Sequence, residues 1–139
     1  MSVVIDASVW VSAADASDSL SATSRRFLEA LVRRRTPVLS PAHTYLEVAC
    51  ALARRLQNDE AGRAIAEGLL RFPQTKSTPL DSTLIREALE LGTAAFLRAG
   101  DALYAAVARR ESAALVAWDA ELIQRAGAVT PQSWLESHA

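Results

Sequence analysis

Cysteine, lysine and long apolar runs are scarce in this chain of 139 residues. Its one cysteine, Cys50, has no partner for an internal disulfide, so a disulfide-stabilised fold is excluded. No apolar run reaches the length that a bilayer span requires. The first residues hold no basic stretch, and the apolar run 3–5 is too short for a signal-peptide core. These absences predict a cytoplasmic protein that is not inserted in a membrane.

The residues that dominate the chain are typical of an ordered, helix-rich domain. Half of all residues in the chain are hydrophobic, mainly Ala, Leu and Val, and only 6% are aromatic. The length predicts one domain over residues 1–139. With a net charge of −1, the chain lacks the excess of basic residues that is typical of a nucleic-acid-binding protein. Every basic residue except Lys76 is an arginine, the better fork for phosphate, so the charge is still compatible with an RNA substrate.

Short apolar runs alternate with segments of helical periodicity along the chain. The apolar runs predict strands at 3–5, 37–39 and 114–118, and weaker ones at 78–80 and near 128–129. Helical spacing predicts helices at about 19–35, 41–56, 59–71, 82–96 and 101–110, with a short one after residue 119. Ser40 and Pro41 are expected to begin the second helix, and Gly100 to break the chain before the fifth. This alternation predicts a three-layer α/β fold, with a short central parallel sheet flanked by helices.

Three aspartates stand at the ends of predicted elements. Asp6 and Asp119 each follow a buried strand directly, where ligand sites form at the carboxyl ends of parallel strands. The alternative interpretation is that each only caps the next helix. Asp101 heads an almost wholly apolar helix, which it could likewise cap. A carboxylate near a buried helix end also needs charge compensation, so a ligand is the second interpretation for Asp101.

Glu47 is the fourth candidate acid. It lies off the apolar stripe of its helix and has no lysine or arginine three or four residues away. Taken alone, it could be a solvated surface glutamate. If the four acids converge they repel one another, and Mg²⁺ or Mn²⁺, which prefer carboxylate oxygens, would resolve that conflict. The Ser8 hydroxyl could assist such a site, or simply lie in the first turn of the following helix.

Four segments in a fixed order resemble a known family, and they span nearly the whole chain. They are 4–8, 45–48, 100–106 and 115–122. The sequence resembles the PIN-domain ribonucleases, specifically the VapC-like toxins of bacterial toxin–antitoxin pairs. The resemblance implies a PIN-like fold and makes Asp6, Glu47, Asp101 and Asp119 the catalytic, metal-binding acids, with Ser8 near the metal. It also implies cleavage of RNA with Mg²⁺ or Mn²⁺, a homodimer and an antitoxin partner.

One position departs from the family pattern. Many members have Thr or Ser two residues before the last acid, where this chain has Ala117. Glu121 is a candidate substitute acid at that corner. The rival interpretation, from another class of function, is a PIN-like binding module that has lost activity. Metal-dependent RNA cleavage that acid-to-amide substitutions abolish would separate the two.

Other patterns carry less weight. His43, Glu47 and Cys50 share a helix face, but too few soft ligands accompany them for a transition-metal site. A receiver domain or a haloacid-type phosphatase would need acids that are missing beside Asp6. The aromatic residues Trp10, Trp118 and Tyr104 could stack on bases, although packing is the expectation for the last two. Arg25, Arg26 and the run 33–35 could contact phosphate, with a solvated helix face as the favoured interpretation.

Overall fold

A computed structural model describes residues 1–139 and shows a four-stranded parallel sheet at the centre of the chain. The strand order is β3-β2-β1-β4, so the first and last strands of the chain are neighbours. Val3 pairs with Val38 on one side and with Ala114 on the other. The strands are β1 (Val3–Ile5), β2 (Val38–Pro41), β3 (Thr75–Thr78) and β4 (Ala114–Val116).

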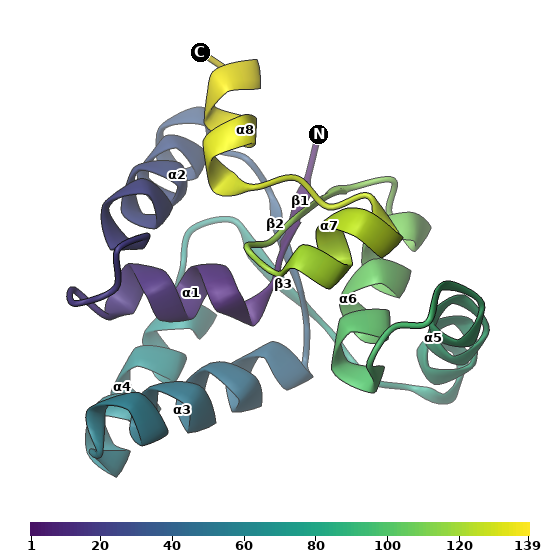
Figure 1. The fold of residues 1–139 in the computed structure, drawn as a ribbon, viewed down its shortest axis with the longest axis horizontal. Coiled ribbons are helices and arrows are strands. Elements are labelled where there is room, and N and C mark those ends of the chain that lie inside the picture. The colour runs from purple at the N-terminus through teal and green to yellow at the C-terminus, as the bar shows by residue number, and fades with distance from the viewer.

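Helices cover both faces of this sheet (Figure 1). Val3 and Ile5 point into a core formed with α1, α2, α3, α4 and α8. Val4 points the opposite way, into a second core formed with α5, α6 and α7. Because both of their faces are covered, β1 and β4 are apolar at every position rather than at alternate ones, whereas the edge strand β3 is polar and partly exposed. The helices are α1 (Ala7–Ala14), α2 (Ser21–Arg34), α3 (His43–Leu56), α4 (Asp59–Leu70), α5 (Ser82–Ala95), α6 (Ala99–Arg110), α7 (Ala120–Ala126) and α8 (Pro131–Ser137).

The predicted three-layer α/β fold is confirmed, with two corrections near the second strand. Ser40 and Pro41 do not begin a helix; they extend β2 and pair with Ser77 and Thr78. The ladder continues to Ala42, whose N–H donates to the Thr78 carbonyl at 2.8 Å, so α3 starts only at His43. Because of this pairing with β2, the third strand comprises Thr75–Thr78 and not the predicted residues 78–80.

The last third of the chain holds three further differences. Gly100 lies inside the first turn of α6, because the helix begins at Ala99. The expected last strand is reduced to a single bridge between Val116 and Val129. Helix α8 was not predicted, although Thr130 caps it and Pro131 occupies its first turn, which is a standard helix start.

Helices α3 and α4 approach each other at a glycine. A Cβ on Gly62 would lie 2.5 Å from the backbone oxygen of Ala49, so this position tolerates no side chain without moving a helix. None of the helices is long and apolar enough to cross a membrane.

Candidate active site

Asp6 and Asp119 lie side by side at the carboxyl ends of the adjacent strands β1 and β4. Each caps the helix that follows its strand. Asp6 Oδ2 accepts a hydrogen bond from the Ser8 N–H at 3.2 Å, and Asp119 Oδ1 accepts from the Glu121 and Leu122 N–H groups at 2.8 and 3.1 Å. A single oxygen of each carboxylate does this, so capping and ligand binding can coexist in the same residue.

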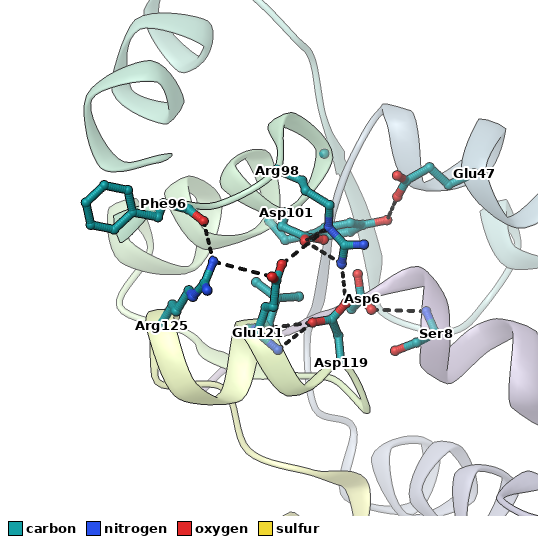
Figure 2. Close-up of polar contacts among 12 residues, drawn as sticks. Asp6, Ser8, Glu47, Phe96, Arg98, Asp101, Asp119, Glu121 and Arg125 are labelled. Carbon is teal, nitrogen blue, oxygen red and sulfur yellow. Dashed lines mark hydrogen bonds and ion pairs between the residues drawn. The ribbon is translucent and has the colours of Figure 1, made fainter. Parts of the chain in front are cut away.

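Asp101 occupies the first turn of α6 and joins Asp119 around a guanidinium (Figure 2). Arg98, three residues before it, donates to Asp101 Oδ2 at 2.9 Å and also contacts the carboxylate of Asp119. Glu121 Oε2 lies 3.6 Å from Arg98 Nε. Carboxylate oxygens of Asp101, Asp119 and Glu121 come within 4.8 Å of one another, which places three acids around one point.

Glu47 is held against the same helix by a buried tyrosine. Tyr104, with no exposed surface, donates its hydroxyl to Glu47 Oε1 at 2.6 Å. A Cβ on Gly100 would lie 2.8 Å from Glu47 Oε2, so the glycine gives Glu47 room beside the start of α6. His43 Nε2 donates to the Gly100 carbonyl at 3.0 Å and lies 3.6 Å from Glu47 Oε1. These contacts fix Glu47 next to Asp101 and account for a glutamate that has no arginine or lysine beside it.

Burial governs the ionisation of the two innermost acids. Burial raises the pKa of Asp6 to about 6. Hydrogen bonds from Ser8 lower this pKa, and repulsion from Asp101 and Glu47 raises it further. Burial also raises the pKa of Asp101, although the Arg98 guanidinium opposes the rise. Burial and the adjacent Glu47 carboxylate raise the pKa of Tyr104, which keeps its hydroxyl a donor. Asp101 is compensated by Arg98, whereas no basic side chain offsets the charge of ionised Asp6, which a bound cation would do.

The acids line a cleft of about 490 Å³ between the start of α1 and one face of α3. Asp6, Glu47 and Asp101 are among the residues that line it, and so are Ser8 and Arg98. Asp119 and Glu121 lie outside this lining and reach the site through Asp101 and Arg98. The four acids of the predicted set therefore form two overlapping groups that share Asp101, and the auxiliary acid Glu121 belongs to the second group.

Ser8 and Ala117 are the two small residues that the sequence placed near the acids. The Ser8 hydroxyl oxygen accepts from the Trp118 N–H at 3.1 Å and so ties α1 to the end of β4. Ala117 is fully buried in the core with α6 and α7.

Three other side chains singled out from the sequence, Trp10, Trp118 and Arg25, have partners within the fold. Trp10 is 7% exposed and packs edge-on against Phe72, and the Trp118 indole donates to the Ser24 hydroxyl at 2.8 Å. Arg25 donates to the Ala13 carbonyl at 2.9 Å. The cleft instead contains Arg54, Arg55 and Arg98, none of which was singled out. For Arg98 a signal was available, since it stands three residues before Asp101 on the same helical turn.

Parallel strands that carry acids at their carboxyl ends, beside an open cleft, define a carboxylate-centred α/β domain suited to binding cations. The family model of the PIN domain matches residues 3–128. The chain therefore belongs to the PIN domain family, and the resemblance found in the sequence is confirmed. No sequence among the curated proteins matches the chain.

Solved structures with the same fold include toxins. VapC20 of Mycobacterium tuberculosis, a toxin that cleaves the sarcin-ricin loop, is 23% identical, with a TM-score of 0.77 over 92% of this chain and 97% of that one. PAE2754 of Pyrobaculum aerophilum is 21% identical, with a TM-score of 0.72 over 99% and 88%. VapBC2 of Rickettsia felis, bound to a promoter DNA fragment, is 15% identical, with a TM-score of 0.71 over 94% and 97%. These likenesses establish the fold.

Proposed function

We propose that this protein is an Mg²⁺- or Mn²⁺-dependent endoribonuclease that hydrolyses RNA phosphodiester bonds. The observation that carries the proposal is the cleft lined by Asp6, Glu47 and Asp101 in a chain of the PIN family. Three carboxylates facing an open cleft cannot bind a polyanion by themselves. With divalent cations between them and the phosphates, the same acids become a site for RNA.

The residues present fit such a cation. Asp101, Asp119 and Glu121 already surround the positive charge of Arg98, so their oxygens form a set of hard donors around one point. Asp6 and Glu47 present further carboxylates on the cleft side of Asp101. We assign Asp6, Glu47, Asp101 and Asp119 as the metal-binding and catalytic acids, with Glu121 and Ser8 as auxiliary residues. When bound, the ion would neutralise phosphate charge and make a water molecule more acidic.

The chain's own side chains set the geometry of this centre. Tyr104 holds Glu47 through its hydroxyl, and the helix-capping bonds hold Asp6 and Asp119 in single orientations. Arg98 is 66% exposed, so it can leave the acids when a cation replaces it and then face a phosphate of the substrate. The Ser8 hydroxyl donates to the Asp6 carboxylate while its oxygen accepts from the Trp118 N–H, so Ser8 helps to hold Asp6 in place.

The alternative is a catalytically silent PIN-like binding module. The burial of Asp6 argues against it, because the ionised form of this aspartate lowers the stability of the metal-free fold. A scaffold gains nothing from that cost, whereas a metal-binding enzyme needs the acid.

We further propose that the protein is the toxin of a toxin–antitoxin pair and acts in the cytoplasm as a homodimer, with residues 1–139 as a single domain. The fold neighbours support the toxin and its partner protein, since they include VapBC2 of Rickettsia felis, a toxin–antitoxin complex from Klebsiella pneumoniae and FitAcB from Neisseria gonorrhoeae. Two cores on one continuous sheet support the single domain.

The decisive experiment is cleavage of total cellular RNA by the purified protein with Mg²⁺, with Mn²⁺ and with EDTA. We expect discrete fragments that require the metal. Asp101→Asn should reduce cleavage by more than about a hundredfold, because even changes in the shell around metal ligands cost 10–100-fold. Asp59→Asn, an exposed acid of α4, should cleave like the wild type. A folded wild-type protein, free of any partner, that shows no metal-dependent cleavage would favour the silent module.

Arg98→Ala is expected to tighten Mn²⁺ binding several-fold and to lower the melting temperature of the metal-free protein. The substitution removes the cation that competes with Mn²⁺ for Asp101 and Asp119, and it leaves those carboxylates to repel each other. Isothermal titration calorimetry and thermal unfolding in EDTA measure the two effects. Arg86→Ala, an exposed arginine of α5, is the matched control. Unchanged Mn²⁺ affinity in Arg98→Ala would refute the competition.

A further inference from the structure

The cleft is lined by carboxylates and also, further along α3, by two arginines. The carboxylates are those of Asp6, Glu47 and Asp101, and the arginines are Arg54 and Arg55. α1 and α3 form the walls and run side by side in Figure 1. A groove with a cation site and guanidinium groups further along it matches the charge pattern that a nucleic-acid strand requires.

The periodicity of α3 sets this arrangement. Glu47, Ala51 and Arg54 are spaced at i, i+4 and i+7, so all three lie on the face of the helix that borders the cleft. Seven residues correspond to a rise of about 10 Å along the helix axis. Between the two charged residues the wall consists of Cys50 and Ala51, whose short side chains let a strand lie close to the helix.

The two neighbouring arginines have different roles. Arg55 donates to Asp15 at 3.1 Å and to Asp18 at 2.8 Å, and these carboxylates raise its pKa. Arg55 therefore links α3 to the segment after α1 and has its charge neutralised. Arg54 has no carboxylate within 4.0 Å and is exposed at the cleft. It is thus an uncompensated guanidinium in the same cleft as the acids.

We propose that Arg54 binds a phosphate of the RNA strand at a distance from the phosphate that is cleaved. The inference rests on the proposed ribonuclease function. An unpaired guanidinium is suited to a phosphate, since its planar fork donates two parallel hydrogen bonds. The strand then runs along the α1–α3 cleft from the acids toward Arg54. Phosphate contacts of this kind set the register of a strand without selecting its sequence.

Arg54→Ala tests this subsite by steady-state cleavage of a short single-stranded RNA. We expect KM to rise about tenfold, the usual scale for a charge-assisted contact, with kcat within about twofold of the wild type. Arg54→Lys should recover part of the loss. Arg86→Ala, whose exposed arginine lies on α5 in the other helical layer, should match the wild type. An unchanged KM in Arg54→Ala would overturn the proposal.

A binding measurement separates this proposal from the nuclease assignment. Fluorescence anisotropy of a labelled RNA bound to Asp101→Asn and to Asp101→Asn/Arg54→Ala, in Mn²⁺, needs no cleavage. Removing one phosphate contact should reduce the slope of log K against log salt by about 0.7 for a single strand. A neutral methylphosphonate at one position should weaken binding to the first protein and not to the second. If the wild type cleaves no RNA but these differences appear, the subsite stands and the nuclease assignment fails.

An acidic protein segment is the competing occupant of the same guanidinium. If Arg54→Ala leaves RNA affinity, salt slope and KM unchanged while it weakens binding of a partner protein, the RNA subsite is refuted and the arginine belongs to a protein interface.

Discussion

Replacing Asp6 by asparagine should abolish RNA cleavage and, at the same time, make the metal-free protein more stable. Cleavage is lost because the variant lacks one of the proposed metal-binding carboxylates. Stability rises because burial holds the pKa of Asp6 at about 6 instead of 3.8, so at pH 7 the folded state carries an ionised group that its surroundings disfavour. That difference corresponds to about 3 kcal/mol in the free energy of unfolding.

The sign of the pH dependence follows from the raised pKa. The folded state holds the proton of Asp6 more strongly than the unfolded state does, so protonation favours folding. The cost of the ionised carboxylate is complete above pH 6, decreases as the pH falls through the interval between the two pKa values, and is absent below 3.8. The stability gain of Asp6→Asn should therefore be largest at neutral pH and fall below about 1 kcal/mol at pH 4.

Urea unfolding in EDTA at pH 7 and pH 4 measures this gain. Asparagine keeps the helix cap, because its side-chain oxygen can still accept from the Ser8 N–H. Asp81→Asn is the matched control: Asp81 caps α5 in the same way but is exposed, so its amide variant should gain nothing. An Asp6→Asn protein less stable than the wild type at pH 7 would contradict the assignment of Asp6 as a functional acid retained at a cost.

Gly62→Ala should lower the free energy of unfolding by about 2 kcal/mol or more, the scale of overpacking in a tight contact. The new methyl group would meet the Ala49 backbone oxygen at 2.5 Å, and the backbone nitrogen and Cβ of Ala53 at 3.0 Å. Backbone atoms cannot turn aside as a flexible side chain can, so α3 and α4 must move apart. Because α3 carries Glu47, cleavage should decline as well.

Gly68→Ala provides the control on the same helix. A Cβ there meets nothing within 4 Å, so the better helix propensity of alanine should stabilise the protein by about 0.5–1 kcal/mol. Thermal and urea unfolding of the two variants compare the effects directly. Equal stability of Gly62→Ala and Gly68→Ala would show that the contact between α3 and α4 is not as close as described.

Local sequence signals were sufficient for β1 and β4 and for the acids that follow them. The runs before Asp6 and Asp119 are apolar at every position, as expected for strands buried on both faces. Asp6 directly follows β1, and Asp119 follows β4 after Ala117 and Trp118, because the strand is shorter than the predicted 114–118. The start of α5 was also predicted at residue 82, and in the structure Asp81 caps it.

Features decided by distant residues could not be read in this way. Ser40-Pro41 is a valid helix start by local rules, and only the pairing with β3 makes it the end of a strand. The hydrogen-bond partner of Glu47 is Tyr104, 57 residues away, and no local sequence feature of α3 or α6 indicates this contact. Arg98 illustrates the same limit, since its contacts with Asp119 and Glu121 exist only after β4 joins β1.

The central position of β1 also has a consequence for biosynthesis. A nascent chain emerges from the ribosome in sequence order, so Asp6 leaves well before Ala114–Val116 and Asp119. Until then β1 lacks one of its two neighbouring strands, and Asp101 and Arg98 have no Asp119 beside them. A fragment truncated before β4 lacks Asp119 and Glu121. For the proposed ribonuclease, this order of emergence delays assembly of the acidic centre until β4 and Asp119 have been synthesised.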